Sequence, residues 1–217
     1  NEKKYGKLVD NIKIDLYSLD NSEEQYLEKY FDKNFIESIN NLDNLNIEEP
    51  INDVIQFPIV NDLFCKELIE LCESKNNWSG ATNKDKRIGY ENVPTNDIHL
   101  TQLNLHDSWQ KFILKYIAPI VSYRWGSFKT TKLNIGFVVK YDKNHKLLQP
   151  HHDSSAYTLN ICLNDEFDGG EINFVKKNKK LKNKKGYCII HPGRITHYHE
   201  ALPISDGNKF VFVSFVY

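Results

Sequence analysis

The chain has 217 residues, of which 40% are hydrophobic and 26% are charged, and its formal net charge is −1. This length is enough for one domain with a buried core. A net charge near zero excludes the strongly basic surface that attracts nucleic acids or anionic membranes, so we expect neither as a partner. No apolar run approaches the roughly 18 residues of a membrane span, so we expect none.

The chain starts at Asn1 and contains no Met, so we expect an excerpt from a longer protein, with any targeting segment upstream. Its four cysteines are too few for a disulfide scaffold. Cys65 and Cys72 fall on one predicted helix, and Cys162 and Cys188 fall on predicted strands. We therefore expect buried free thiols rather than disulfides.

Residues 1–50 form a polar segment, which we interpret as a lead-in to a single domain over residues 51–217. Within the lead-in, residues 23–40 have the apolar spacing of an amphipathic helix, which is either part of that segment or a packing partner of the domain. Apolar residues recur at helical spacing over residues 61–75 and 107–123, so we expect two further helices. Because Pro119 disfavours a continuous helix, the sequence does not fix the residue at which the second helix ends.

After Trp125, short runs rich in β-branched and aromatic residues alternate with turn residues. Helices followed by many short strands indicate an α+β fold, with a double-stranded β-helix (jelly-roll) core and flanking helices. The lysine-rich stretch 176–185 is interpreted as a solvated hairpin loop, and an electrostatic contact with a partner is the alternative. The predicted strands cover residues 132–141, 157–163, 170–175, 186–191 and 210–217.

The segment after residue 149 carries the pattern that points to chemistry. His151 and Asp153 lie two residues apart at a strand entry, so their side chains share one face. A second imidazole from a distant strand, His197 or His199, would complete two imidazoles and one carboxylate, the ligand set of non-haem Fe(II) oxygenases. Lys209, ten residues after His199, can place a cation deeper in the barrel for the far carboxylate of 2-oxoglutarate.

Several stretches resemble the C-terminal catalytic domain of the procollagen-lysine 2-oxoglutarate 5-dioxygenases, the collagen lysyl hydroxylases. The resemblance covers residues 57–217, and the expectation includes a viral member of the family. The stretches that carry it are GYENVPT (89–95), DIH (97–99), FVVKY (137–141), PHHDSS (150–155), TLNI (158–161), HPGR (191–194), HYHE (197–200) and VSFV (213–216).

The resemblance implies that His151, Asp153 and His199 bind Fe(II). The family places its co-substrate cation ten residues after the ligand histidine, and this spacing to Lys209 selects His199 over His197. Lys209 is accordingly the candidate catalytic residue that anchors 2-oxoglutarate.

By the same resemblance, Tyr141, Asn160 and Arg87 occupy positions that hydrogen-bond the co-substrate, although the spacing from Arg87 to Tyr90 is shorter here than in the family. A packed Tyr141 and a turn-forming Asn160 are the structural alternatives.

The implied activity is hydroxylation of lysine side chains in collagen-like protein to 5-hydroxylysine, with Fe(II), 2-oxoglutarate, O2 and ascorbate. Lys209 departs from the pattern of the lysyl hydroxylase family, which usually carries Arg at this position. Prolyl 4-hydroxylases use Lys there. The alternatives are therefore a prolyl hydroxylase, or a non-catalytic jelly-roll module that binds collagen-like chains or a structural metal. The family also implies a homodimer in the lumen of the endoplasmic reticulum, or in the host cell for a viral member.

Overall fold

The computed structural model describes residues 23–81, 94–126 and 129–217. Its centre is a seven-stranded antiparallel sheet in the order β1-β2-β10-β6-β13-β4-β3. These strands are β1 (Glu48–Ile51), β2 (Val54–Pro58), β3 (Asp97–His99), β4 (Leu133–Tyr141), β6 (Tyr157–Cys162), β10 (Tyr187–Pro192) and β13 (Lys209–Val216).

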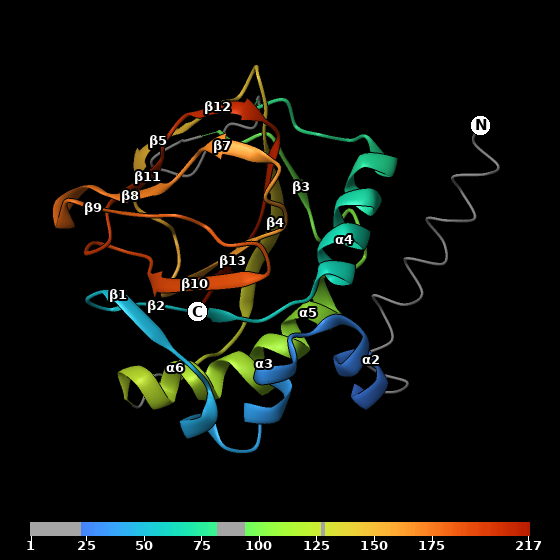
Figure 1. The fold of residues 1–217 in the computed structure, drawn as a ribbon, viewed down its shortest axis with the longest axis vertical. Helices are drawn as coiled ribbons and strands as arrows, with labels where there is room; N and C mark the ends of the chain where they lie inside the picture. Colours follow the sequence, from blue (N-terminus) through green and yellow to red (C-terminus); the bar gives the residue numbers. More distant parts are fainter. Residues whose placement is uncertain (1–22, 82–93, 127–128) are drawn as a thin grey trace.

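A four-stranded sheet in the order β5-β11-β8-β9 lies on one side of the larger sheet, and a two-stranded ladder of β12 and β7 accompanies it (Figure 1). The two sheets enclose an apolar interior, so the predicted jelly-roll core is present. The strands are β5 (Leu148–His151), β7 (Phe167–Gly169), β8 (Ile172–Phe174), β9 (Lys179–Leu181), β11 (His199–Ala201) and β12 (Ile204–Gly207).

The α-helices cover the other side of the larger sheet, whereas the short helix η4 connects two strands of the smaller sheet (Figure 1). α4 starts where the Asn61 side chain accepts hydrogen bonds from two backbone N–H groups, and it ends at Asn76 in a left-handed conformation. The described helices are α2 (Glu23–Tyr30), α3 (Lys33–Ser38), η2 (Leu42–Asn44), α4 (Asp62–Lys75), α5 (His106–Phe112), η3 (Ile113–Ile117), α6 (Ala118–Trp125) and η4 (Val175–Lys177).

Aromatic rings join these helices to the sheet. Phe31, between α2 and α3, stacks on Phe112 of α5 at a centroid distance of 4.5 Å. Trp109 of α5 lies 4.7 Å from the ring of Phe212 on β13, and its indole N–H donates a hydrogen bond to Ser214. Residues from α2 and α3 therefore belong to the same hydrophobic core as the sheet, so the amphipathic segment of residues 23–40 is a packing partner.

Several expectations differ from the structure in detail. The helix expected over residues 23–40 is two helices, because Asp32 accepts hydrogen bonds from the backbone of Asn34 and Phe35 and starts α3. The helix expected over residues 107–123 passes through one π-helical segment, η3, before α6. The lysine-rich stretch is mostly exposed, as expected, but it includes the short strand β9.

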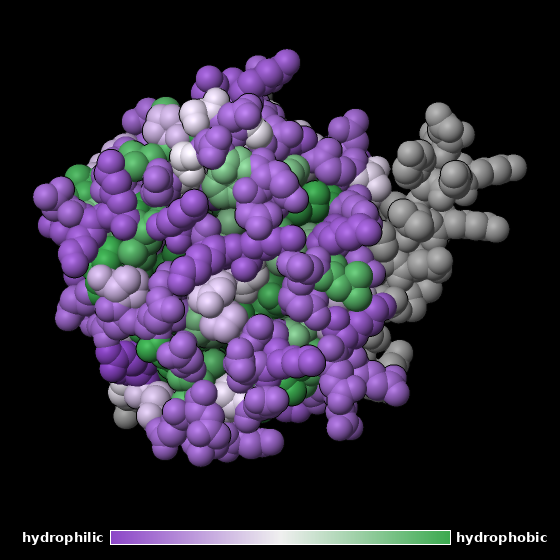
Figure 2. Space-filling model, viewed as in Figure 1, coloured by the Kyte–Doolittle hydropathy of each residue, from purple (hydrophilic) through white to green (hydrophobic). Residues whose placement is uncertain are grey.

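All four cysteines are buried free thiols, as the sequence predicted. None of the helices in the described ranges combines the length and apolar character that crossing a bilayer requires. The face in Figure 2 is mainly hydrophilic, with small apolar patches between the polar side chains.

Candidate metal centre

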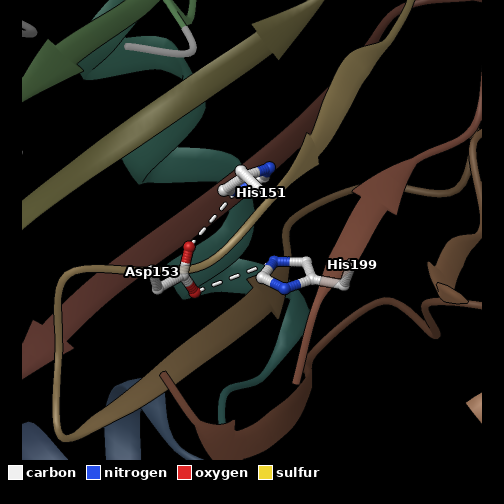
Figure 3. A group of neighbouring side chains, drawn as sticks. All are labelled: His151, Asp153 and His199. Atoms are coloured by element: carbon white, nitrogen blue, oxygen red, sulfur yellow. Dashed lines mark ion pairs between the residues drawn. The ribbon is translucent and has the colours of Figure 1, made fainter. Parts of the chain in front are cut away.

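Three of the predicted site residues converge on the smaller sheet. His151 ends β5, Asp153 follows two residues later, and His199 begins β11. His151 and His199 are paired across neighbouring antiparallel strands, so their rings share one face and their centroids lie 4.6 Å apart. One ligand atom from each residue lies within 4.8 Å of the other two (Figure 3). This geometry can hold one metal ion.

Both imidazoles are oriented by backbone carbonyls. Nδ1 of His151 lies 2.7 Å from the carbonyl oxygen of Gln149, and Nδ1 of His199 lies 2.8 Å from that of His197. Because a carbonyl only accepts, each Nδ1 carries the proton and each Nε2 keeps a lone pair for a metal. The Asp153 carboxylate lies 3.2 Å from Nε2 of His151 and 3.7 Å from Nε2 of His199. The residues present therefore fit a divalent ion held by two nitrogens and one carboxylate.

The charge states suit this role. Burial of Asp153 favours the protonated acid, but the neighbouring His199 and His151 outweigh burial and hold the pKa of the Asp153 carboxyl well below its usual value. Burial lowers the pKa of His199, although Asp153 opposes that shift. An ionised carboxylate beside neutral imidazoles is the form that binds a metal cation.

A further buried histidine, His191 on β10, adjoins the centre. Its Nε2 lies 3.3 Å from Nδ2 of Asn160 and 3.8 Å from the Asp153 carboxylate. Burial lowers the pKa of His191 to about 3, so this ring is neutral. His191 was not among the predicted site residues, although its place two residues after the buried Ile189 puts both on one face of β10.

Lys209 lies at the start of β13, on the face that turns toward the smaller sheet. It shares this face with Val211 and Val213, which pack in the interior cluster with Tyr141. The Lys209 side chain is 1% exposed, and its ammonium lies 5.6 Å from the centre of the Tyr141 ring. Across the described ranges, no carboxylate lies within ion-pair distance of this ammonium, so it is a buried cation that can take an anionic ligand.

The remaining predicted site residues divide into two groups. Tyr141 and Asn160 are both 8% exposed and lie on the larger sheet, and Asn160 pairs with Val213 on the interior face. Burial, with the nearby Asp153 charge, raises the pKa of the Tyr141 hydroxyl, so the phenol is protonated. Arg87 falls outside the described residues. The binding roles of all these side chains stay predictions.

The two histidines that sequence could confuse with ligands point elsewhere. Nε2 of His152 lies 3.0 Å from the carbonyl oxygen of Ile195. Nδ1 of His197 lies 2.8 Å from the hydroxyl of Thr196, and its Nε2 lies 3.4 Å from the carbonyl oxygen of Asn52. Neither ring belongs to the cluster that could hold a metal.

Comparison with known proteins finds similar sequences among the lysyl hydroxylases. The chain is 40% identical over 210 residues to chicken (Gallus gallus) procollagen-lysine,2-oxoglutarate 5-dioxygenase 1, covering 93% of this chain and 28% of that protein. The chain is a relative of the procollagen lysyl hydroxylases. It is also 37% identical over 234 residues to the procollagen lysyl hydroxylase and glycosyltransferase of Acanthamoeba polyphaga mimivirus, covering 100% of this chain and 26% of that protein.

The chain thus spans little more than a quarter of these lysyl hydroxylases. No family model matches it.

Solved structures confirm the fold. The truncated viral collagen prolyl hydroxylase of Paramecium Bursaria Chlorella virus-1 superposes with a TM-score of 0.56 at 17% identity, over 76% of this chain and 88% of that one. A prolyl-4-hydroxylase from Pseudomonas putida gives a TM-score of 0.54 at 12% identity, over 84% of this chain and 97% of that one. The predicted α+β jelly roll of the 2-oxoglutarate oxygenase type is therefore correct.

Proposed function

We propose that this chain is the catalytic domain of an Fe(II)- and 2-oxoglutarate-dependent dioxygenase that hydroxylates lysine side chains in collagen-like protein. The convergence of His151, Asp153 and His199 on one face of the smaller sheet carries this proposal. The relatedness to lysyl hydroxylases supports lysine as the target.

Each site residue has a defined task in this proposal. Nε2 of His151, Nε2 of His199 and one Asp153 oxygen would hold Fe(II). The buried ammonium of Lys209 binds the far carboxylate of 2-oxoglutarate. Tyr141 and Asn160 offer hydrogen bonds from the same interior face, and Arg87 is a further candidate by resemblance.

The bound iron supplies the oxidation: one atom of O2 enters a lysine C–H bond to give 5-hydroxylysine, and the other enters succinate as 2-oxoglutarate loses CO2. The protein contributes placement and electrostatics. Its buried, partly apolar interior keeps bulk water from the reacting groups. Ascorbate is proposed as the reductant that would keep the enzyme active.

Succinate release tests the proposal directly. The chain is incubated with Fe(II), 2-oxoglutarate and either a lysine-containing or a proline-only collagen peptide. Succinate and a +16 Da lysine product only with the first peptide are expected. Product on the proline-only peptide would instead favour the prolyl hydroxylase that Lys209 suggests, and absence of peptide-coupled succinate would favour a non-catalytic module.

Metal replacement gives a second test of the same proposal. EDTA should abolish succinate release and Fe(II) should restore it. Zn(II) should bind at least as tightly as Fe(II), because protein sites of this kind generally have a higher affinity for Zn(II). It should inhibit succinate release, because Zn(II) has no redox chemistry. Full turnover by a preparation that contains no metal by elemental analysis would exclude the iron mechanism.

The assembly and the location follow from the family resemblance alone. We propose a homodimer, which sedimentation would test, and a location in the endoplasmic reticulum lumen or in the host cell of a virus. The division at residue 50 into lead-in and dioxygenase domain also stays a prediction, although α2 and α3 share the hydrophobic core with the sheet.

A further inference from the structure

Asn183 is an inward-turned residue in an otherwise exposed, lysine-rich connection between β9 and β10. It is 7% exposed, whereas both flanking lysines, Lys182 and Lys184, are exposed. Its side-chain oxygen accepts a hydrogen bond from the Lys209 ammonium at 3.1 Å. Its side-chain nitrogen, Nδ2, is buried and lacks a hydrogen-bond partner in the described part of the chain. A buried donor without a partner typically costs about 1–3 kcal/mol, so its presence requires an explanation.

The orientation of this amide follows from its neighbour. An ammonium has three N–H donors and no acceptor, so the Asn183 oxygen must face Lys209 and Nδ2 must face away from the bond. A second Lys209 donor is used by the backbone carbonyl of Gly170. One N–H of Lys209 and the N–H groups of Asn183 Nδ2 therefore remain for another acceptor.

Gly170 lies directly against the Lys209 side chain. Its φ of +70° favours glycine, and a Cβ there would lie 3.2 Å from Cδ of Lys209 and 2.9 Å from a methyl carbon of Ile204. A side chain at this position would press on the lysine stem. The fold thus holds two adjacent donor groups, one charged and one neutral, in a buried place.

We propose that Asn183 is a second residue of the co-substrate site, whose Nδ2 donates a hydrogen bond to the same carboxylate of 2-oxoglutarate that Lys209 binds. This inference rests on the proposed function. Lysine alone is a point charge, whereas a carboxylate has two acceptor oxygens. Lys209 and Asn183 together offer a donor to each oxygen, and a 2-oxo acid without the far carboxylate would leave both donors unpaired.

Direct binding of 2-oxoglutarate to the Mn(II)-loaded protein, measured by calorimetry, tests this assignment without turnover. Asn183→Ala should weaken binding about 10-fold or more, the scale of one hydrogen bond to a charged group. Asn183→Asp should weaken it further, because it removes the donors and pairs Lys209 with a protein carboxylate. Lys182→Gln, at the exposed neighbouring position, is the matched control and should bind as the wild type does.

A double-variant comparison separates direct contact from mere support of Lys209. In a Lys209→Ala background, Asn183→Ala should still lower 2-oxoglutarate affinity several-fold, because the amide contacts the ligand itself. No further loss in that background, or unchanged binding in Asn183→Ala alone, would overturn the assignment. Melting temperature and Mn(II) content are measured for each variant, and Asn183→Asp serves if Asn183→Ala does not fold.

The outcomes also separate this inference from the proposed function. If wild-type protein with Mn(II) does not bind 2-oxoglutarate, the proposed function fails. If Lys209→Ala weakens binding while Asn183→Ala does not, only the role of Asn183 fails.

Discussion

The two faces of β13 show how one strand serves two purposes. Toward the helices, Phe210, Phe212 and Val216 pack in the large hydrophobic core, and Ser214 accepts the indole hydrogen bond of Trp109. Toward the smaller sheet, β13 contributes Lys209, Val211 and Val213 to the interior that holds the candidate site. Because strand side chains alternate, stability and ligand binding are assigned to alternate residues.

The two faces of β13 differ in how their side chains affect the stability of the fold. The helical face is filled by stacked aromatic rings. The interior face keeps a buried ammonium without an ion-pair partner among the described residues, and next to it the Asn183 amide nitrogen without a hydrogen-bond partner there. Buried polar groups of this kind destabilise a fold unless a ligand pairs with them, so the two faces should respond differently to substitution.

The largest expected effect is at the metal centre. His199→Ala should eliminate turnover and lower bound iron, because it removes one of three ligands. His197→Ala should keep measurable turnover and iron, because His197 points to Thr196 and Asn52. Metal content and succinate release are measured for both variants, and the reverse pattern would show that the ligand assignment is wrong.

On the helical face, the effect should be on stability alone. Phe212 is 2% exposed and lies against Trp109 and Phe64. Phe212→Ala should lower the free energy of unfolding by about 3–5 kcal/mol through the cavity it leaves. Urea unfolding measures the loss, and 2-oxoglutarate affinity of the folded protein should not change. A large drop in that affinity would mean that the two faces are coupled.

On the interior face, stability should depend on pH through Lys209. Burial lowers the pKa of its ammonium from 10.5 to about 8. The folded state therefore releases this proton near pH 8, while the unfolded chain keeps it until about pH 10.5, so stability rises with pH between these values.

Replacement of the ammonium isolates this contribution. Without 2-oxoglutarate, Lys209→Met should be more stable than the wild type by up to roughly 3 kcal/mol at pH 7, and the difference should vanish near pH 10.5. Urea unfolding across this range measures it. A difference that does not change with pH would show that the ammonium is not destabilised by burial.

The remaining expected effect concerns the affinity for co-substrate. Lys209→Ala should raise the KM for 2-oxoglutarate roughly 30-fold or more, because truncating one partner of a buried charge pair typically loses about 2–5 kcal/mol. Lys209→Arg should keep much more activity, since its guanidinium is also cationic. Iron content should not change in either variant. An unchanged 2-oxoglutarate curve for Lys209→Ala would remove Lys209 from the site.

Local sequence patterns determined much of the fold. Apolar spacing over residues 61–75 located α4, and runs rich in β-branched and aromatic residues located the long strands β4 and β13. Very short strands such as β9 and β11 were missed, because three residues carry too little periodicity to identify a strand. Their positions depend on pairing with distant neighbours.

Some residues of the candidate site could likewise be found from the sequence, and others only from the tertiary structure. The spacing of His151, Asp153, His199 and Lys209 was enough to suggest a metal and a dicarboxylate ligand. Only the tertiary structure shows His191 beside Asp153, and Asn183 beneath the lysine-rich connection against Lys209. A lone Asn among lysines looks like a solvated loop residue in sequence. In the folded chain its side chain turns inward and accepts a hydrogen bond from the buried Lys209 ammonium.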